Sequence, residues 1–443
     1  MGYTRKFLSL DGLLKTVRQS FQREEFGDVS QMTYSTVDCL MSGLAIYGLK
    51  FSSLLQFNRS IKEESCINCN IRNLYGVKTV PSDTQMRERL DRIAAKQIRR
   101  AYKQIFTHCQ RGKVLEQYRY IDGYYITSID GTGQYSSTRV HCENCCEKKN
   151  KKSGEVTYYH QMLGAVLVHP DQKFVIPFAP EPIVKGDGAN KNDCERNASK
   201  RLLKDLRREH PHLKLLIVED GLASNHPHLS LLDSLDMAYV IGVKPGDHKY
   251  LFDWINALDG TTYCRTDEKD IRHEFTYYHD IPLNDANHDY RVNVIEYREI
   301  KPNGKQQKFS WVTRIDINND NIYQLMRAGR SRWKIENETF NTLKNQGYNF
   351  EHNYGHGYQN LCSVLTMLMM LMFLIEQVQQ LCCKTYQGAR KRVGKFSVLY
   401  EKIRTLCEYA AWNNYTQLLD FIGNYKERSP PESANWMTVI DEE

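Results

Sequence analysis

The chain has 443 residues, of which 41% are hydrophobic and 26% are charged, so its length allows roughly three globular domains. Its formal net charge is +7, and 60 Lys and Arg residues supply material for local basic patches that attract phosphate backbones. Thirteen cysteines, an odd number scattered through a long chain, argue against a disulfide framework and indicate a reducing compartment, which we expect to be the cytoplasm.

Neither a signal segment nor a membrane span is expected. Met1 to Lys6 is not followed by an apolar signal segment. The most apolar run, Leu361 to Ile375, is about 15 residues long, short of the roughly 20 that a membrane span needs. We therefore predict a buried core helix there and no membrane partner.

Residues 1–115 are predicted to form a helical DNA-binding domain. Apolar residues recur at three- and four-residue spacing in Leu8–Phe21 and Ser35–Tyr47. Another helix is expected to begin at Pro81-Ser-Asp-Thr84, with Ser or Asp as its cap. Basic residues recur along this helix: Arg87, Arg89, Arg92, Lys96, Arg99, Arg100 and Lys103. Two interpretations of them remain open, a solvated basic face and a face that contacts DNA.

Residues 116–245 are predicted to form the first part of an α/β core. The aromatic and β-branched run from Tyr124 to Ile129 reads as a buried strand that delivers Asp130 to a tight turn, ended by Gly131 and Gly133. The elements expected next are strands 161–169 and 173–178, helix 191–209, strand 213–218, helix 227–235 and strand 238–243. This order predicts a mixed sheet covered by helices.

Residues 246–320 change to an alternating β pattern and are interpreted as a β insertion in the core. Strands are expected at 273–278, 290–297 and 308–314, with a hairpin turn at Pro302-Asn-Gly304 between the last two. Residues 321–383 return to a helical pattern and complete the core, with helices at 323–343 and 361–383. A helical C-terminal region, 384–443, follows, with a helix at 394–411 and a polar tail.

Two acidic residues follow hydrophobic strands and precede a glycine. Asp130 and Asp220 each occupy such a position, and alone each is typical of a turn. Together, on strands of one sheet, they can share a divalent cation. Hard oxygen ligands in a half-open site are what Mg²⁺ prefers.

A third acid is offered by the predicted helix that contains Arg332-Trp-Lys-Ile-Glu336. On an α-helix Arg332, Glu336 and Phe340 share one face at i, i+4 spacing. That face also approaches Lys344. An exposed Arg–Glu helix pair is the alternative interpretation of the stretch taken alone.

These three stretches together resemble the DDE transposases of bacterial insertion sequences. The matching residues are Ile129-Asp130-Gly-Thr-Gly, Val218-Glu-Asp220-Gly-Leu and Arg332-Trp-Lys-Ile-Glu336 with Lys344, and the resemblance runs from about residue 70 to 380. The most similar group is the cut-and-paste branch with a Tyr-Arg-Glu-Lys signature. The resemblance implies an RNase H-like core, a mixed sheet with helices on both faces, in which Asp130, Asp220 and Glu336 hold two Mg²⁺ or Mn²⁺ ions.

The chain departs from this signature at two positions. The residue three before Arg332 is Gly329 where the family has Tyr, and Tyr323 is the nearest preceding tyrosine. Lys344 stands eight residues after Glu336 rather than seven. Glu338 therefore remains an alternative third acid.

By resemblance the expected function is DNA transposition, with double-stranded DNA as partner and a homodimer at the element ends. Arg332 and Lys344 are expected to hold phosphates. Tyr323, Lys244 and His248 are further candidates for DNA contacts, with ordinary loop residues as the alternative for the last two. Two other functions remain open: a metal-dependent nuclease on the same core, and a domesticated DNA-binding protein without catalysis.

A cysteine- and histidine-rich stretch is a separate candidate metal site. Cys142 and Cys145 have the two-residue separation of zinc ligands, and Cys146, His160 or His141 can complete four. Reduced cysteines on a β hairpin are the alternative. Four lysines nearby, Lys148, Lys149, Lys151 and Lys152, form a basic hairpin tip that contacts either DNA or solvent.

Overall fold

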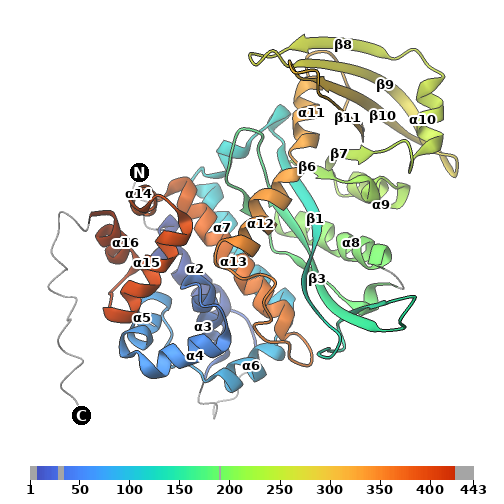
Figure 1. The fold of residues 1–443 in the computed structure, drawn as a ribbon. Coiled ribbons are helices and arrows are strands. Elements are labelled where there is room, and N and C mark those ends of the chain that lie inside the picture. Colours follow the sequence, from blue (N-terminus) through green and yellow to red (C-terminus); the bar gives the residue numbers. More distant parts are fainter. Residues whose placement is uncertain (1–6, 28–33, 189–190, 425–443) are drawn as a thin grey trace, which may run out of the picture.

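The computed structural model describes residues 7–27, 34–188 and 191–424. A helical body built from both ends of the chain packs beside a large mixed sheet (Figure 1). The sheet carries the two candidate strand acids, and the helix with the third candidate acid crosses from the sheet toward the helical body.

Helices dominate the N-terminal part, as predicted. They are α2 (Leu10–Gln22), α3 (Thr36–Gly48), α4 (Leu54–Glu63), α5 (Ser65–Tyr75), α6 (Asp83–Asp91), η1 (Ala95–Ile98) and α7 (Arg99–Arg111), followed by the short turns η2 (Leu115–Tyr118) and η3 (Ile121–Gly123). The predicted cap of α6 is confirmed, because the Ser82 side chain accepts the Gln85 backbone N–H.

From the sequence, the basic run from Arg87 to Lys103 is predicted to lie on one helix. This prediction is wrong, because the run is divided among α6, η1 and α7. No single helix therefore carries all seven basic residues. Arg99 is buried at the start of α7, where its guanidinium pairs with Glu209 at 2.7 Å and Asp205 at 3.3 Å. A buried arginine is held by paired carboxylates rather than by DNA.

The core sheet has the strand order β2-β3-β1-β6-β7, followed by β11-β10-β9-β8. Its bounds are β1 (Tyr125–Ser137), β2 (Cys146–Lys149), β3 (Val156–Leu167), β6 (Leu215–Glu219) and β7 (Ala238–Val243), and the short β4 (Ile176–Pro177) and β5 (Glu181–Ile183) pair with β3. β3 runs antiparallel to β1, and β6 and β7 run parallel to it. This is the RNase H-like mixed sheet that was expected.

The predicted stop of β1 at Gly131 and Gly133 is wrong, since the strand continues to Ser137. Its antiparallel partner β3 stays in register past Asp130, which faces Gly164 across the ladder. Pairing with β6, by contrast, ends at Ser128 and Val218. Asp130 therefore lies within a strand, at the point where the parallel neighbour ends.

Helices cover both faces of this sheet. α8 (Lys191–Glu209) and α9 (His226–Ser234) lie on one face, and the η5 turn (Gly221–Ala223) follows β6. α8 places the Glu195 carboxyl group so close to Gly131 that a Cβ there would lie 3.2 Å from it. The glycine after Asp130 thus makes room for a helix rather than forming a turn.

The β insertion continues the same sheet beyond β7. α10 (Lys249–Asn256) precedes β8 (Thr261–Thr266), β9 (Arg272–Asn284), β10 (Asn287–Ile300) and β11 (Gln306–Thr313), and β11 pairs with β7. The predicted turn at Pro302-Asn-Gly304 is confirmed, with Gly304 at φ +80°. β8 was not predicted; its residues are mostly exposed and lack an apolar alternation.

The helix predicted over 323–343 is interrupted. α11 (Ile322–Arg330) ends before Arg332, and a π-helical segment, η6 (Ile335–Phe340), leads into α12 (Asn341–Asn345). α13 (Leu361–Cys382) has the length and apolar composition of a membrane span, but it is almost entirely buried in the helical body. It is the core helix that the sequence predicted.

The C-terminal region adds α14 (Lys384–Val393), α15 (Phe396–Tyr409) and α16 (Tyr415–Asn424). The predicted helix 394–411 corresponds to α15, whereas α14 and α16 were not predicted. These helices pack against α2, α5 and α13, so both ends of the chain share one core (Figure 1).

Candidate active site

Asp130 lies within β1, Asp220 directly follows the neighbouring strand β6, and both lie on the same face of the sheet. Ser128 and Val218 are in register across β1 and β6, so their side chains point the same way. Asp130 comes two residues after Ser128, and Asp220 comes two residues after Val218. Because the backbone is extended at both aspartates, their side chains point to that same face. The Asp220 side chain accepts the Leu222 backbone N–H at 2.9 Å, which caps η5.

Arg332 joins Asp130 to the third candidate acid. Its Nη1 lies 3.1 Å from Asp130 Oδ2 and 2.8 Å from Glu336 Oε1. The other Asp130 oxygen, Oδ1, accepts the Gly131 backbone N–H at 2.8 Å. Burial, together with a hydrogen bond to the Glu336 carboxyl group, raises the pKa of Asp130 to about 7. Two carboxyl groups this close favour a shared proton or a cation between them.

Two contacts with the sheet position this helical segment. The Ser128 hydroxyl donates to the Arg332 carbonyl oxygen at 2.9 Å. Gly164, the ladder partner of Asp130, lies under the Phe340 ring, and a Cβ at this glycine would stand 3.2 Å from two ring atoms. The absence of a side chain at Gly164 therefore lets η6 lie directly on β3 beside Asp130.

Glu338, the alternative third acid, lies elsewhere on the segment. It lines a separate cavity with Thr342, Gln346 and residues of the C-terminal helices, whereas Glu336 contacts Arg332. Lys344, the predicted phosphate ligand, lies on α12, and its ammonium group pairs with the Glu351 carboxylate at 2.8 Å. In the described part of the chain, none of Glu336, Glu338 and Lys344 lines the cavities around Asp220, so it is the contact with Arg332 that distinguishes Glu336.

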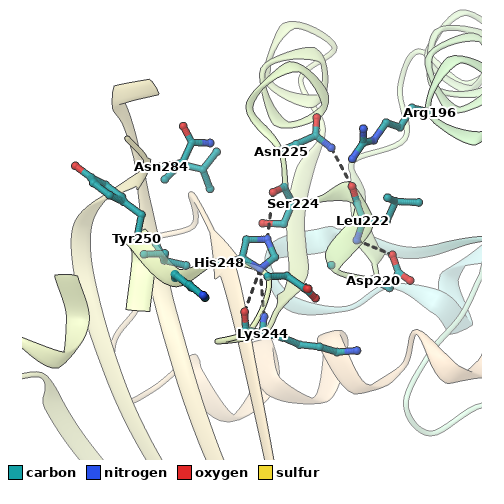
Figure 2. A pocket seen from close by; sticks show the side chains of 14 residues that line it. Arg196, Asp220, Leu222, Ser224, Asn225, Lys244, His248, Tyr250 and Asn284 are labelled. Atoms are coloured by element: carbon teal, nitrogen blue, oxygen red, sulfur yellow. Dashed lines mark hydrogen bonds between the residues drawn. The ribbon is translucent and has the colours of Figure 1, made fainter. Parts of the chain in front are cut away.

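A cavity of about 570 Å³ opens beside Asp220 (Figure 2). The predicted residues Lys244 and His248 line it, and His248 Nε2 lies 3.3 Å from the Ser224 carbonyl oxygen. This contact joins the turn after β7 to the segment after Asp220. Arg196, on α8, also lines the cavity, and nothing in the sequence distinguishes it from the other charged residues of that helix.

A second, larger cavity of about 780 Å³ runs from Asp220 to Arg332. Its lining combines cations and aromatic rings with four acids: Lys244, Arg298, Lys308, Arg330, Phe309, Trp311 and Trp333, beside Glu219, Asp220, Glu274 and Glu296. Trp333 is half exposed, with the Arg332 guanidinium 4.8 Å from its ring. The cavity connects Asp220 and Arg332 to the β insertion.

Tyr323 lies on α11 under the β insertion, away from these cavities. The Arg265 guanidinium stacks 4.0 Å from its ring, and His273 meets the ring edge-on. The structure therefore does not bring Tyr323 together with Asp130 and Arg332. The signature position three before Arg332 is filled by Gly329, where a Cβ would stand 2.5 Å from the Trp311 indole nitrogen. The packing of Trp311 leaves no space for a tyrosine there.

The predicted zinc ligands are only partly brought together. Cys142, Cys145 and His160 converge, but Cys146 points away, with its Sγ 3.8 Å from the Ile183 carbonyl oxygen. The fourth member of the cluster is His356, which follows Cys145 by 211 residues and was not predicted. His141 instead stacks on Tyr158.

The sequence matches the profile of a known family over most of the sheet-forming region. The profile, described as "Transposase DDE domain", matches residues 122–374, more than half of the chain. No curated protein matches the sequence significantly. Among solved structures, the piggyBac transposase synaptic complex with hairpin DNA has a TM-score of 0.40 and 12% identity, covering 98% of this chain and 82% of that one.

The matched residues run from before β1 into the core helix α13, and they include both strand acids, η6 and Arg332. The chain belongs to the transposase DDE domain family.

Proposed function

We propose that this protein is a cut-and-paste DNA transposase that binds the terminal inverted repeats of an insertion sequence. In this proposal it cleaves phosphodiester bonds at the repeats and joins the freed ends to target DNA. The observation that carries the proposal is the convergence at Arg332, which holds Asp130 and Glu336 together on the sheet face shared by Asp220.

The donor set at this face fits divalent cations. Three carboxylates supply the hard oxygen ligands that Mg²⁺ and Mn²⁺ prefer. The raised pKa of Asp130 fits the same interpretation, because a carboxyl pair of this kind lowers its mutual repulsion by taking up a cation. We propose that Asp130, Asp220 and Glu336 hold two such ions, which would stabilise charge on the attacking and leaving oxygens.

The protein's own residues position DNA in this proposal. The cavity between Asp220 and Arg332 offers Lys244 and Lys308 for phosphates and aromatic rings for sugars or bases, whereas its Arg298 and Arg330 pair with Glu274 and Glu299. Arg332 has a guanidinium beside the acids, suited to a phosphate oxygen once the carboxylates hold metal. Lys244 and His248 line the adjoining cavity and are assigned to the flanking backbone (Figure 2).

The wider assignment follows from the family. The expected partner is double-stranded DNA, at the element ends and at the target, and two chains are required to hold two ends together. The expected place of action is the cytoplasm, on nucleoid DNA. Residues 1–115 remain the proposed DNA-binding region.

The test uses purified protein, Mg²⁺ and DNA that carries the inverted repeats bracketing the reading frame. Cleavage at the repeat boundary followed by joined products supports the proposal. Double-strand cleavage without joining favours the metal-dependent nuclease. Repeat binding without cleavage, unchanged by Asp130→Ala, favours the non-catalytic DNA-binding protein.

A further inference from the structure

Four sulfur and nitrogen ligand atoms converge at one point where the loop after β1 and strand β3 meet the segment before α13. Cys142 and Cys145 come from the loop after β1, His160 from β3, and His356 from the segment before α13. Their ligand atoms all lie within 4.8 Å of one another. Cys145, His160 and His356 are buried.

The separations match the edges of a zinc tetrahedron. The two Sγ atoms are 3.8 Å apart, and each lies 3.4 Å from His160 Nε2. Cys145 Sγ lies 3.4 Å from His356 Nε2 as well. Zinc bonds of about 2.3 Å to sulfur and 2.0–2.1 Å to nitrogen place tetrahedral ligands about 3.3–3.8 Å apart. A disulfide is excluded, because bonded sulfurs lie about 2.05 Å apart.

We propose that Cys142, Cys145, His160 and His356 bind one structural Zn²⁺ ion. Two thiolates and two imidazoles favour Zn²⁺ over the hard cations proposed for the carboxylates, so the site is chemically distinct from the active site. Four protein ligands complete the tetrahedron and leave no open position for a substrate or water, which assigns the ion a structural role.

The site ties together two segments that are distant in the chain. On one side is the loop and hairpin between β1 and β3, with the exposed lysine tip at 148–152. On the other is the segment between α12 and α13, which is already fixed at one end because the Asp91 carboxylate accepts the backbone N–H groups of residues 358–361. Asn144 adds a 2.7 Å hydrogen bond to the Gln359 carbonyl oxygen.

Zinc therefore anchors the segment between α12 and α13 to the hairpin between β1 and β3. This role is independent of the proposed transposition chemistry, since none of the four ligands lines the cavities around Asp220 in the described residues. Failure of the DNA cleavage assay would leave the zinc proposal intact.

The experiment measures metal content in the full-length protein purified without chelator and supplied with zinc. We expect about one zinc per chain in the wild type, and loss of most of it in Cys145→Ser and His356→Ala. Cys146→Ala is the matched control, a neighbouring buried cysteine outside the cluster, and should retain zinc. Less than about a tenth of an equivalent in the wild type, or loss of zinc in Cys146→Ala but not in His356→Ala, overturns the proposal.

A second measurement does not depend on whether the variants fold. Zinc-depleted wild-type protein titrated with Co²⁺ should gain the visible absorption of a tetrahedral cobalt–thiolate site, which added zinc then abolishes. Hydrogen exchange in residues 351–360 should also slow on zinc addition. The assigned site is contradicted if the bound cobalt shows only the weak visible absorption of an octahedral ion. It is also contradicted if zinc does not change the rate of hydrogen exchange in residues 351–360.

Discussion

At the scale of single residues, the proposed active site depends on one guanidinium between two carboxylates. Arg332 is 16% exposed at its side chain and contacts both Asp130 and Glu336, so each contact is only partly screened by water. Hydrogen bonds to charged groups of this kind contribute about 1.5–3 kcal/mol each. Arg332 is thus assigned two functions, positioning Glu336 and contacting a phosphate.

The first prediction concerns this residue. Arg332→Gln should lower the rate of DNA end cleavage by about tenfold to a hundredfold, because one charge-assisted contact near the reacting phosphate is lost. Repeat binding, measured by gel shift, should change much less. Arg327→Gln is the control on α11, since Arg327 pairs with Asp171 rather than with the acids, and it should cleave at nearly the wild-type rate. A wild-type rate in Arg332→Gln would remove the residue from the site.

At the scale of secondary-structure elements, η6 is the element that completes the site. The π-helical turn appears where the segment meets the sheet, and such turns are frequent at functional sites. Its docking uses Gly164, Phe340 and the Ser128 hydroxyl. Apolar periodicity predicts a continuous helix over 323–343. It does not reveal the extra residue that makes the turn at Ile335–Phe340 π-helical.

The second prediction tests this docking. Gly164→Val should push the Phe340 ring away from β3, separate Glu336 from Asp130 and lower cleavage at least about a hundredfold, at a stability cost of about 1–3 kcal/mol. Adding Phe340→Leu should restore part of the rate by making room. Gly133→Ala is the control on β1, because a Cβ there meets nothing within 4 Å. Cleavage unchanged in Gly164→Val would show that η6 is not held through this contact.

Elements with a strong local pattern were predictable from sequence. β7 has the predicted bounds, 238–243, and α13 is the buried helix that its apolar composition predicts. The end of β1 was misplaced because glycine was interpreted as a turn residue, whereas Gly131 serves a close approach of α8. His356 could not be found from spacing, since its partners lie on distant segments that only the tertiary fold brings together.

At the scale of the whole molecule, a buried ionic network joins the two ends of the chain. Lys50, after α3, donates to the Glu376 carboxylate on α13 at 2.5 Å. Tyr348 and Tyr400 donate to the same carboxylate, and both rings lie within 4.2 Å of the Lys50 ammonium group. Burial lowers the pKa of Lys50, and Glu376 counteracts this shift. The network therefore fixes the N-terminal helices to α13 and α15 within the helical body.

The third prediction follows from this network. Glu376→Gln should lower the free energy of unfolding by about 3–5 kcal/mol, because it leaves the buried Lys50 charge without its partner. Denaturant unfolding followed by circular dichroism measures the change. Glu63→Gln is the control, since its exposed pair with Arg59 contributes at most about 1 kcal/mol. Equal, small effects of both substitutions would contradict a role of the network in holding the helical body together.

The most direct test of the central claim compares end cleavage by four variants, with repeat binding measured in parallel. Asp130→Asn, Asp220→Asn and Glu336→Gln should each lower cleavage at least about a thousandfold, because each removes a ligand to metal ions that supply several kcal/mol. Binding should be nearly unchanged. Glu338→Gln, which alters the neighbouring acid on the same segment, should cleave within a few-fold of wild type. A Glu336→Gln variant that cleaves normally, or a Glu338→Gln variant that does not, would contradict the assignment of the three acids.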